Sequence, residues 1–266
     1  MKYTITIILI FFSLIQVSCQ SETNLKLITK NRGVSPKSIE KYYVVRNNKK
    51  IRTGKYEKYK GVVLVETGYY KNNLRDSIWT DYSLDGNIIA QGNFKNDYKV
   101  GLWYYLSFQG DTIQIYNHTD KIMVYYNIEK ERELFPHKIL LNGLDTEIDT
   151  SKLTIADKIP VFIGGTTMIH NLIITNLTYP VIDAENGKKG VSKVAFTIDK
   201  EGKINNVYTK NTISEGIDKE AIRLVNLLGD NWEPGEQNGK KVNVEFVLPL
   251  TFSFDYDYSI KQLMNR

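Results

Sequence analysis

Several residue types that mark particular chemistries are scarce in this chain of 266 residues. There is one cysteine, so no intramolecular disulfide can form. The three histidines, His118, His137 and His170, are not spaced as metal ligands, and neither a nucleophile elbow nor a phosphate-binding glycine loop is present. We therefore expect no enzymatic activity, no catalytic residues, no metal site and no cofactor.

Charge of one sign is not concentrated anywhere. The 35 lysines and arginines and the 30 acidic residues give a formal net charge of +5 that is spread along the chain. Nucleic-acid-binding proteins gather basic residues into patches, so we expect no nucleic acid partner. There are only six prolines, against 18 glycines and 18 tyrosines. Aromatic residues favour strands and glycine favours turns, which predicts a β-rich protein.

Long apolar runs are missing except near the N-terminus. Residues 5–15 are almost entirely apolar, and this run is shorter than the roughly 20 residues that span a bilayer. Its length is typical of a signal-peptide core, so we expect a signal peptide over residues 1–19. The single cysteine, Cys19, follows Ser18 and resembles the lipobox of bacterial lipoproteins, although Gln16 stands where that motif has an aliphatic residue. Lipidation of Cys19 would provide a membrane anchor; ordinary cleavage that discards Cys19 and an uncleaved signal anchor are the alternatives.

Two polar segments are typical of connections. Residues 20–41 carry few large apolar side chains, which predicts a flexible tether. Residues 129–159 contain charged runs and predict a linker with room for one short strand. Its acidic residues lack the spacing of a calcium-binding loop.

A repeat lies between these segments. Residues 68–86 align with residues 92–110 at a constant offset of 24 residues, which places Trp79 on Trp103. Such a period indicates stacked units, each of them a hairpin here. The stripe that contains both tryptophans is either a ligand or partner surface or the thin core of an extended sheet. The small number of units favours the core.

The second unit runs glycine, aromatic residue, asparagine turn, glycine, tryptophan, tyrosine, glycine, and the first unit follows it except at the second glycine. Over about residues 42–118 this order resembles the MORN-variant repeats of YwqK-type proteins. The resemblance implies a sheet of β-hairpin repeats, which we place at residues 42–128. Ser77 occupies the position of Gly101, where the pattern has glycine, so the turn at Ser77 is expected to be distorted.

The periodicity of apolar residues predicts the helices and strands of the C-terminal part. Thr167 is the expected N-cap of one helix, and Asp218 of another. Between them, residues 193–198 and 204–209 alternate as the strands of a hairpin, and residues 242–248 predict a last strand. Such an order predicts an α+β fold, with two helices on one face of an antiparallel three-stranded sheet.

The residues at the turns and at the ends of the expected helices and strands of this part resemble the TonB C-terminal domain over about residues 160–255. We place this domain at residues 160–256 and a tail at 257–266. The structural positions that carry the resemblance include Tyr179, Pro180, Gly190, Asp218, Trp232, Pro234 and Gly235.

The resemblance to the TonB C-terminal domain implies a periplasmic module that binds a short extended peptide by adding it to a sheet edge. On this sequence the pairing strand would contain Val242, Val244, Phe246 and Leu248. The expected partner is an envelope protein or peptide, such as an outer-membrane receptor. The localisation implied is the cell envelope, in the periplasm. Together with lipidation of Cys19, we expect an outer-membrane lipoprotein. The alternative is a TonB-type energy transducer, which needs an uncleaved N-terminal anchor and a long spacer.

Overall fold

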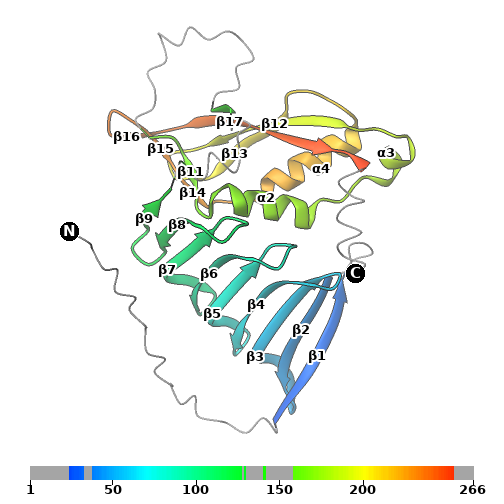
Figure 1. Cartoon of the computed structure of the whole chain (residues 1–266), viewed down its shortest axis with the longest axis vertical. Helices are drawn as coiled ribbons and strands as arrows, with labels where there is room; N and C mark the ends of the chain where they lie inside the picture. Colours follow the sequence, from blue (N-terminus) through cyan, green and yellow to red (C-terminus); the bar gives the residue numbers. More distant parts are fainter. Residues whose placement is uncertain (1–23, 33–37, 128, 130–139, 142–157, 255–266) are drawn as a thin grey trace, which may run out of the picture.

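The structure is a computed structural model, and it describes residues 24–32, 38–127, 129, 140–141 and 158–254. The expected signal peptide with Cys19 and the expected tail at 257–266 lie outside the described residues. The described chain is α+β, with a long antiparallel sheet followed by a small C-terminal domain (Figure 1).

The first nine strands form one antiparallel sheet in sequence order, which we call the repeat sheet. Every strand pairs with the next strand along the chain, so the sheet is a meander of hairpins. Its strands are β1 Leu25–Arg32, β2 Ser38–Val45, β3 Asn48–Lys60, β4 Val63–Lys71, β5 Leu74–Tyr82, β6 Ile88–Lys95, β7 Tyr98–Leu106, β8 Thr112–Asn117 and β9 Ile122–Tyr126.

The expectation of a flexible tether over residues 20–41 is wrong for β1 and the start of β2. Leu25 pairs with Val45 and Arg32 with Ser38, so β1 is the first strand of the repeat sheet. The polar composition was misleading because an edge strand is held by backbone hydrogen bonds and leaves much side-chain surface in water. Leu27 on this strand is 49% exposed.

The repeat is visible as a repeated contact between a glycine and a tryptophan. A Cβ added to Gly68 would lie 2.2 Å from the Trp79 ring, and one added to Gly92 would lie 2.3 Å from the Trp103 ring. The indole nitrogens donate to equivalent carbonyl oxygens as well, Trp79 to Tyr69 at 3.1 Å and Trp103 to Asn93 at 3.0 Å. Each tryptophan therefore lies flat over the glycine of the preceding strand, and a side chain there would displace it.

The expected distortion at Ser77 is not observed. Ser77 has φ of 62° and Gly101 has φ of 60°, so the serine adopts the same left-handed conformation as the glycine. The turns before them are also alike, since Asn72 and Asn96 share φ of 51°. Pairing with the neighbouring strands imposes this geometry, and the serine bears the strain locally.

The C-terminal domain is built on a four-stranded antiparallel sheet in the order β10-β17-β12-β13. The expected three strands are β12 Gly190–Ile198, β13 Ile204–Thr209 and β17 Val244–Phe252; β10 Leu140–Leu141, from the expected linker, is the additional one. Small pairs complete the fold: β11 Val161–Phe162 with β14 Trp232–Glu233, and β15 Gly235–Gln237 with β16 Lys240–Val242. A two-residue strand has no periodicity, which is why the sequence did not locate β10.

Helices α2 Gly165–Asn176 and α4 Glu215–Asn226 pack on one face of this sheet, as expected, and a short third helix, α3 Val181–Glu185, was not expected. Both predicted caps are wrong. The N-cap of α2 is Gly164, and Thr167 lies in the first turn. The N-cap of α4 is Ser214, whose hydroxyl accepts a hydrogen bond from the Ile217 N–H at 3.1 Å.

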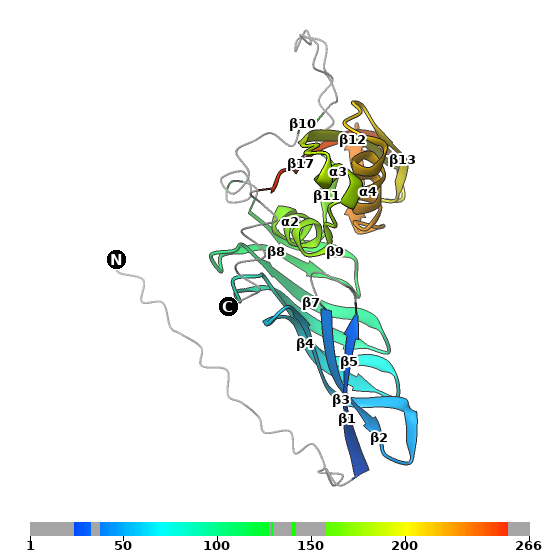
Figure 2. The same cartoon turned by 90° about the vertical axis from the view of Figure 1, so that its right-hand side faces the viewer.

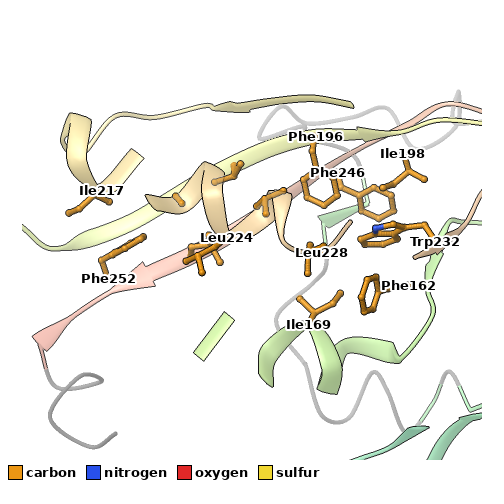
Figure 3. Close-up of a cluster of buried hydrophobic side chains, with 14 residues drawn as sticks. Phe162, Ile169, Phe196, Ile198, Ile217, Leu224, Leu228, Trp232, Phe246 and Phe252 are labelled. Carbon is orange, nitrogen blue, oxygen red and sulfur yellow. The ribbon is translucent and has the colours of Figure 1, made fainter. Parts of the chain in front are cut away.

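The core of the C-terminal domain lies between the helices and the sheet (Figure 3). Phe196 and Phe246 stack from neighbouring strands with their ring centroids 5.7 Å apart. Trp232 packs against Phe246, and the cluster is closed by Leu224 of α4 and by Leu228 in the turn after this helix. Alternate residues of β12 and β17 thus point to the helices, as the period-two pattern predicted.

The two parts of the chain pack together through α2 and β11, which lie over the ends of β6, β7 and β8 (Figures 1 and 2). Gln114 of β8 is fully buried, and its side-chain amide bonds the backbone at Phe162 and Gly164. The Tyr116 hydroxyl donates to Glu233 at 2.7 Å. These hydrogen bonds, buried at Gln114 and partly buried at Tyr116, connect the repeat sheet to the C-terminal domain.

Candidate partner-binding edge

The four residues proposed for strand pairing do not all belong to one strand. Val242 ends β16 and pairs with Gly235, whereas the other three residues lie on β17. The side chains of Val244, Phe246 and Leu248 pack in the core of the C-terminal domain. A partner strand added to β17 would therefore contact the backbone of β17 and the side chains of the alternate residues, which point away from the core.

The backbone direction along β17 follows from its neighbour β12. The Lys193 N–H donates to the Asn211 side chain and the Lys193 carbonyl accepts from the Lys210 N–H, on the side of β13. The Val191 carbonyl accepts from the Asn211 amide on the same side. Both residues thus direct their backbone groups away from β17 and form non-hydrogen-bonded pairs with it.

The partners of these two residues on β17 must then direct their own backbone groups outward. Lys193 pairs with Pro249 and Val191 with Thr251. With the alternation of a β-strand, the outward positions of β17 are Glu245, Val247, Pro249 and Thr251. We call these four residues the β17 edge.

Two of the four positions on the β17 edge are already closed to a further strand. Leu140 of β10 pairs with Val247, which is 7% exposed. Pro249 has no N–H to donate. Glu245 and Thr251 are exposed and retain both backbone groups, so they are the positions where an added strand can form complete hydrogen-bonded pairs.

The remaining structural positions of the resemblance shape the surroundings of the sheet. The Tyr179 hydroxyl donates to the Lys188 carbonyl, and Pro180 is the N-cap of α3. Gly190 begins β12 at the contact with Ile213, where an added Cβ would approach to 3.2 Å. Asp218 lies in the first turn of α4 and accepts from the Ile213 N–H at 3.4 Å.

Trp232 and the residues that follow it pack in the core, just before the β15–β16 hairpin in the chain. The Trp232 side chain is 8% exposed, and its backbone carbonyl faces Gly202, where an added Cβ would lie 2.2 Å away. Pro234 and Gly235 are buried. A Cβ on Gly235 would lie 2.9 Å from both Pro160 and Val244. These positions have structural roles and no exposed polar group.

The tryptophans of the repeat sheet do not offer ring faces to a ligand. Trp79 is 2% exposed and Trp103 is 1% exposed. Each also carries a cation from its own sheet, with the Lys99 ammonium 4.0 Å from the Trp103 ring centre and the Arg75 guanidinium 5.8 Å from that of Trp79. Their packing is that of the thin core.

A polar cluster borders this aromatic core. Glu66 and Asp81 are directly opposite each other on β4 and β5. Burial, with a smaller contribution from the Asp81 carboxylate, raises the pKa of Glu66 to about 7. Lys99 donates to the Tyr105 hydroxyl at 3.2 Å, and burial lowers the Lys99 pKa. Tyr105 in turn bonds His118 at 2.9 Å, and burial lowers the His118 pKa to about 4.

The polar cluster has the composition of a partly buried network of charges and hydrogen bonds. Within the part of the chain that the structure describes, no group of three His, Cys, Asp or Glu side chains is arranged to hold a metal ion. Over the same residues, no helix has the length and apolar character needed to cross a membrane.

A small antiparallel sheet with helices on one face and backbone groups directed outward along its edge strand is typical of protein-interaction modules. Residues 175–254 match the family described as the Gram-negative bacterial TonB protein C-terminal. This match runs from the end of α2 to the end of β17 and supports an envelope-associated protein-interaction or TonB-like role. It does not extend to the repeat sheet, so the resemblance to MORN-variant repeats stays a prediction. A search of curated proteins found no match.

Proposed function

We propose that this protein is a membrane-anchored envelope protein that binds an extended segment of another envelope protein at the β17 edge. The observation that carries the proposal is the outward direction of the backbone at Glu245 and Thr251, in a domain similar to the TonB C-terminal domain. Backbone pairing supplies the affinity in this mode of recognition, and alternate side chains supply the selectivity. The proposed anchor is a lipid on Cys19.

The strand-pairing part can be tested inside cells with a photo-reactive amino acid at position 245, which is exposed on the edge. We expect a discrete crosslinked adduct with an envelope protein. Thr251→Pro should reduce the adduct about fivefold or more, because it removes an outward N–H while leaving the β12–β17 hydrogen bonds intact. The same photo-reactive residue at position 219, on the exposed side of α4, is the matched control and should give no discrete adduct.

An adduct that Thr251→Pro leaves unchanged would contradict strand addition at this edge. Circular dichroism and thermal unfolding of Thr251→Pro must match the wild type, since the substitution is designed to spare the fold. Proline is already present two positions earlier on the same side of the strand, at Pro249, which supports its tolerance here.

The anchor is tested by intact mass and membrane fractionation of the wild type beside Cys19→Ala. Loss of the signal peptide together with acyl mass on Cys19, and wild-type protein in the outer membrane, would establish a lipoprotein. Full-length, unacylated protein in the inner membrane would instead favour the TonB-type energy transducer.

A further inference from the structure

The β17 edge carries a short strand of the same chain at the position that a partner would use. Leu140 lies opposite Val247 and Leu141 opposite Phe246, antiparallel to β17. Val247 directs its backbone outward, so the pair of Leu140 and Val247 is the hydrogen-bonded one. The backbone of Leu141 points to the other side of β10, away from β17.

From this geometry we propose that Leu140–Leu141 is an internal competitor for the partner strand, released when the partner pairs with the β17 edge. The inference rests on the proposed function of that edge. A partner that pairs with both Glu245 and Thr251 must pass Val247, which lies between them and is held by Leu140. The two strands cannot share this position, because one outward N–H and one carbonyl serve one neighbour.

The same geometry states what kind of segment fits. A segment that replaces β10 residue for residue is extended, runs antiparallel to β17, and has an apolar pair at the positions of Leu140 and Leu141. The partner strand cannot accept a hydrogen bond from Pro249, which has no N–H, so pairing at this position is incomplete.

Competition within one chain is effective even when the contact is small. A tethered segment competes at an effective concentration on the order of millimolar. A partner at lower concentration can displace it only by binding more tightly, through a longer pairing. The described part of β10 covers two residues of β17, whereas a partner can reach from Glu245 to Thr251. The internal strand therefore favours binding of a long partner strand over binding of short, nonspecific segments.

Two adjacent proline substitutions separate this proposal from general destabilisation. Leu140→Pro removes the N–H that faces Val247, whereas Leu141→Pro removes an N–H that faces away from β17. We expect hydrogen exchange at the Val247 amide to accelerate about tenfold or more in Leu140→Pro, and to change little in Leu141→Pro. Unchanged protection of Val247 in Leu140→Pro would overturn the proposal.

Binding supplies the second readout, with a labelled synthetic peptide that copies residues 137–143 as the probe. The full-length Leu140→Pro protein should bind this peptide about tenfold or more tightly than the wild type, and the peptide should restore slow exchange at Val247. Equal binding by both proteins would contradict an internal competitor. If Leu140→Pro opens the edge but yields no adduct at position 245 in cells, the competitor stands and the proposed function fails.

Discussion

The side-chain amide of Gln114 in the repeat sheet bridges the backbone of β11 and α2, accepting from the Gly164 N–H at 2.8 Å and donating to the Phe162 carbonyl at 3.0 Å. Gln114 is fully buried, and both partner residues, Phe162 and Gly164, are buried as well. One side chain thus satisfies two buried backbone groups of the other domain and fixes its position.

Removal of this bridge should destabilise the whole chain. Gln114→Ala leaves a buried N–H and a buried carbonyl without partners, which costs about 2 to 3 kcal/mol of unfolding free energy. Urea unfolding of the purified protein measures the change. Gln109→Ala is the matched control, because Gln109 is exposed in the turn between β7 and β8, and its effect should stay below about 0.5 kcal/mol. Equal losses in the two variants would contradict the bridging role.

The contact between Gly92 and Trp103 predicts a steric effect. Gly92→Ala places a methyl group 2.3 Å from the indole ring, and the forced shift should cost about 3 kcal/mol of stability. In a Trp103→Leu background the same substitution should cost at least 1 kcal/mol less, roughly, because the smaller side chain leaves room. Thermal and urea unfolding of the four proteins give the coupling energy, and additive effects would refute the contact.

The strain at Ser77 predicts a stabilising substitution. Ser77→Gly relieves a non-glycine residue with φ of 62° and should raise the unfolding free energy by about 1 kcal/mol. The reciprocal change Gly101→Ser, at an equivalent position with open space around the Cβ, should lower it by about the same amount. Differential scanning calorimetry of both variants is the measurement. A destabilised Ser77→Gly would show that the serine hydroxyl outweighs the backbone strain.

The raised pKa of Glu66 predicts a pH dependence of stability. The folded state holds the proton up to about pH 7, above the ordinary range of a glutamate, so the stabilisation is present at acidic pH and is lost as pH rises through 7. Glu66→Gln should therefore reduce the loss of stability between pH 5 and pH 8 by roughly 2 kcal/mol. Urea unfolding at both pH values tests this.

Asp85→Asn, in the exposed turn after β5, is the matched control for Glu66→Gln. It should leave the difference between pH 5 and pH 8 as in the wild type. His118 acts in the opposite direction: its neutral form is favoured in the folded protein, so its contribution is present above about pH 6.5 and is lost as pH falls toward 4. Because His118 is present in both proteins, the difference between Glu66→Gln and the wild type over pH 5 to pH 8 isolates the Glu66 effect.

Features with a local cause were predictable from the sequence. The hairpin of β12 and β13 was legible because its strands alternate apolar and polar residues around a turn, which the Asp199 side chain closes by accepting from the Glu201 and Lys203 N–H groups. The equivalence of Trp79 and Trp103 was legible because the repeat preserves the glycine beneath each ring. The helix caps were misplaced by a few residues. Helix α2 begins at Gly164 without a side-chain cap, and near the start of α4 both Ser214 and Asp218 are residue types that can serve as the cap.

Features that depend on distant backbone pairing were missed. β1 has the composition of a tether, β10 is two residues long, and Gln114 is one glutamine among several. For Gln114, the available signal was a polar residue between the apolar residues of a strand, next to Ile113. Its hydrogen-bond partners could not be named without the fold.

By itself the sequence determined the local elements: the glycine and tryptophan repeat, the hairpin of β12 and β13, and the resemblance to the TonB C-terminal domain. Only the tertiary structure decided which edges are open, that Leu140 pairs with Val247, and that Gln114 joins the two domains. Side-chain periodicity is written in the sequence, whereas every residue except proline carries the same backbone donor and acceptor, so the sequence cannot show which of them pair across long distances.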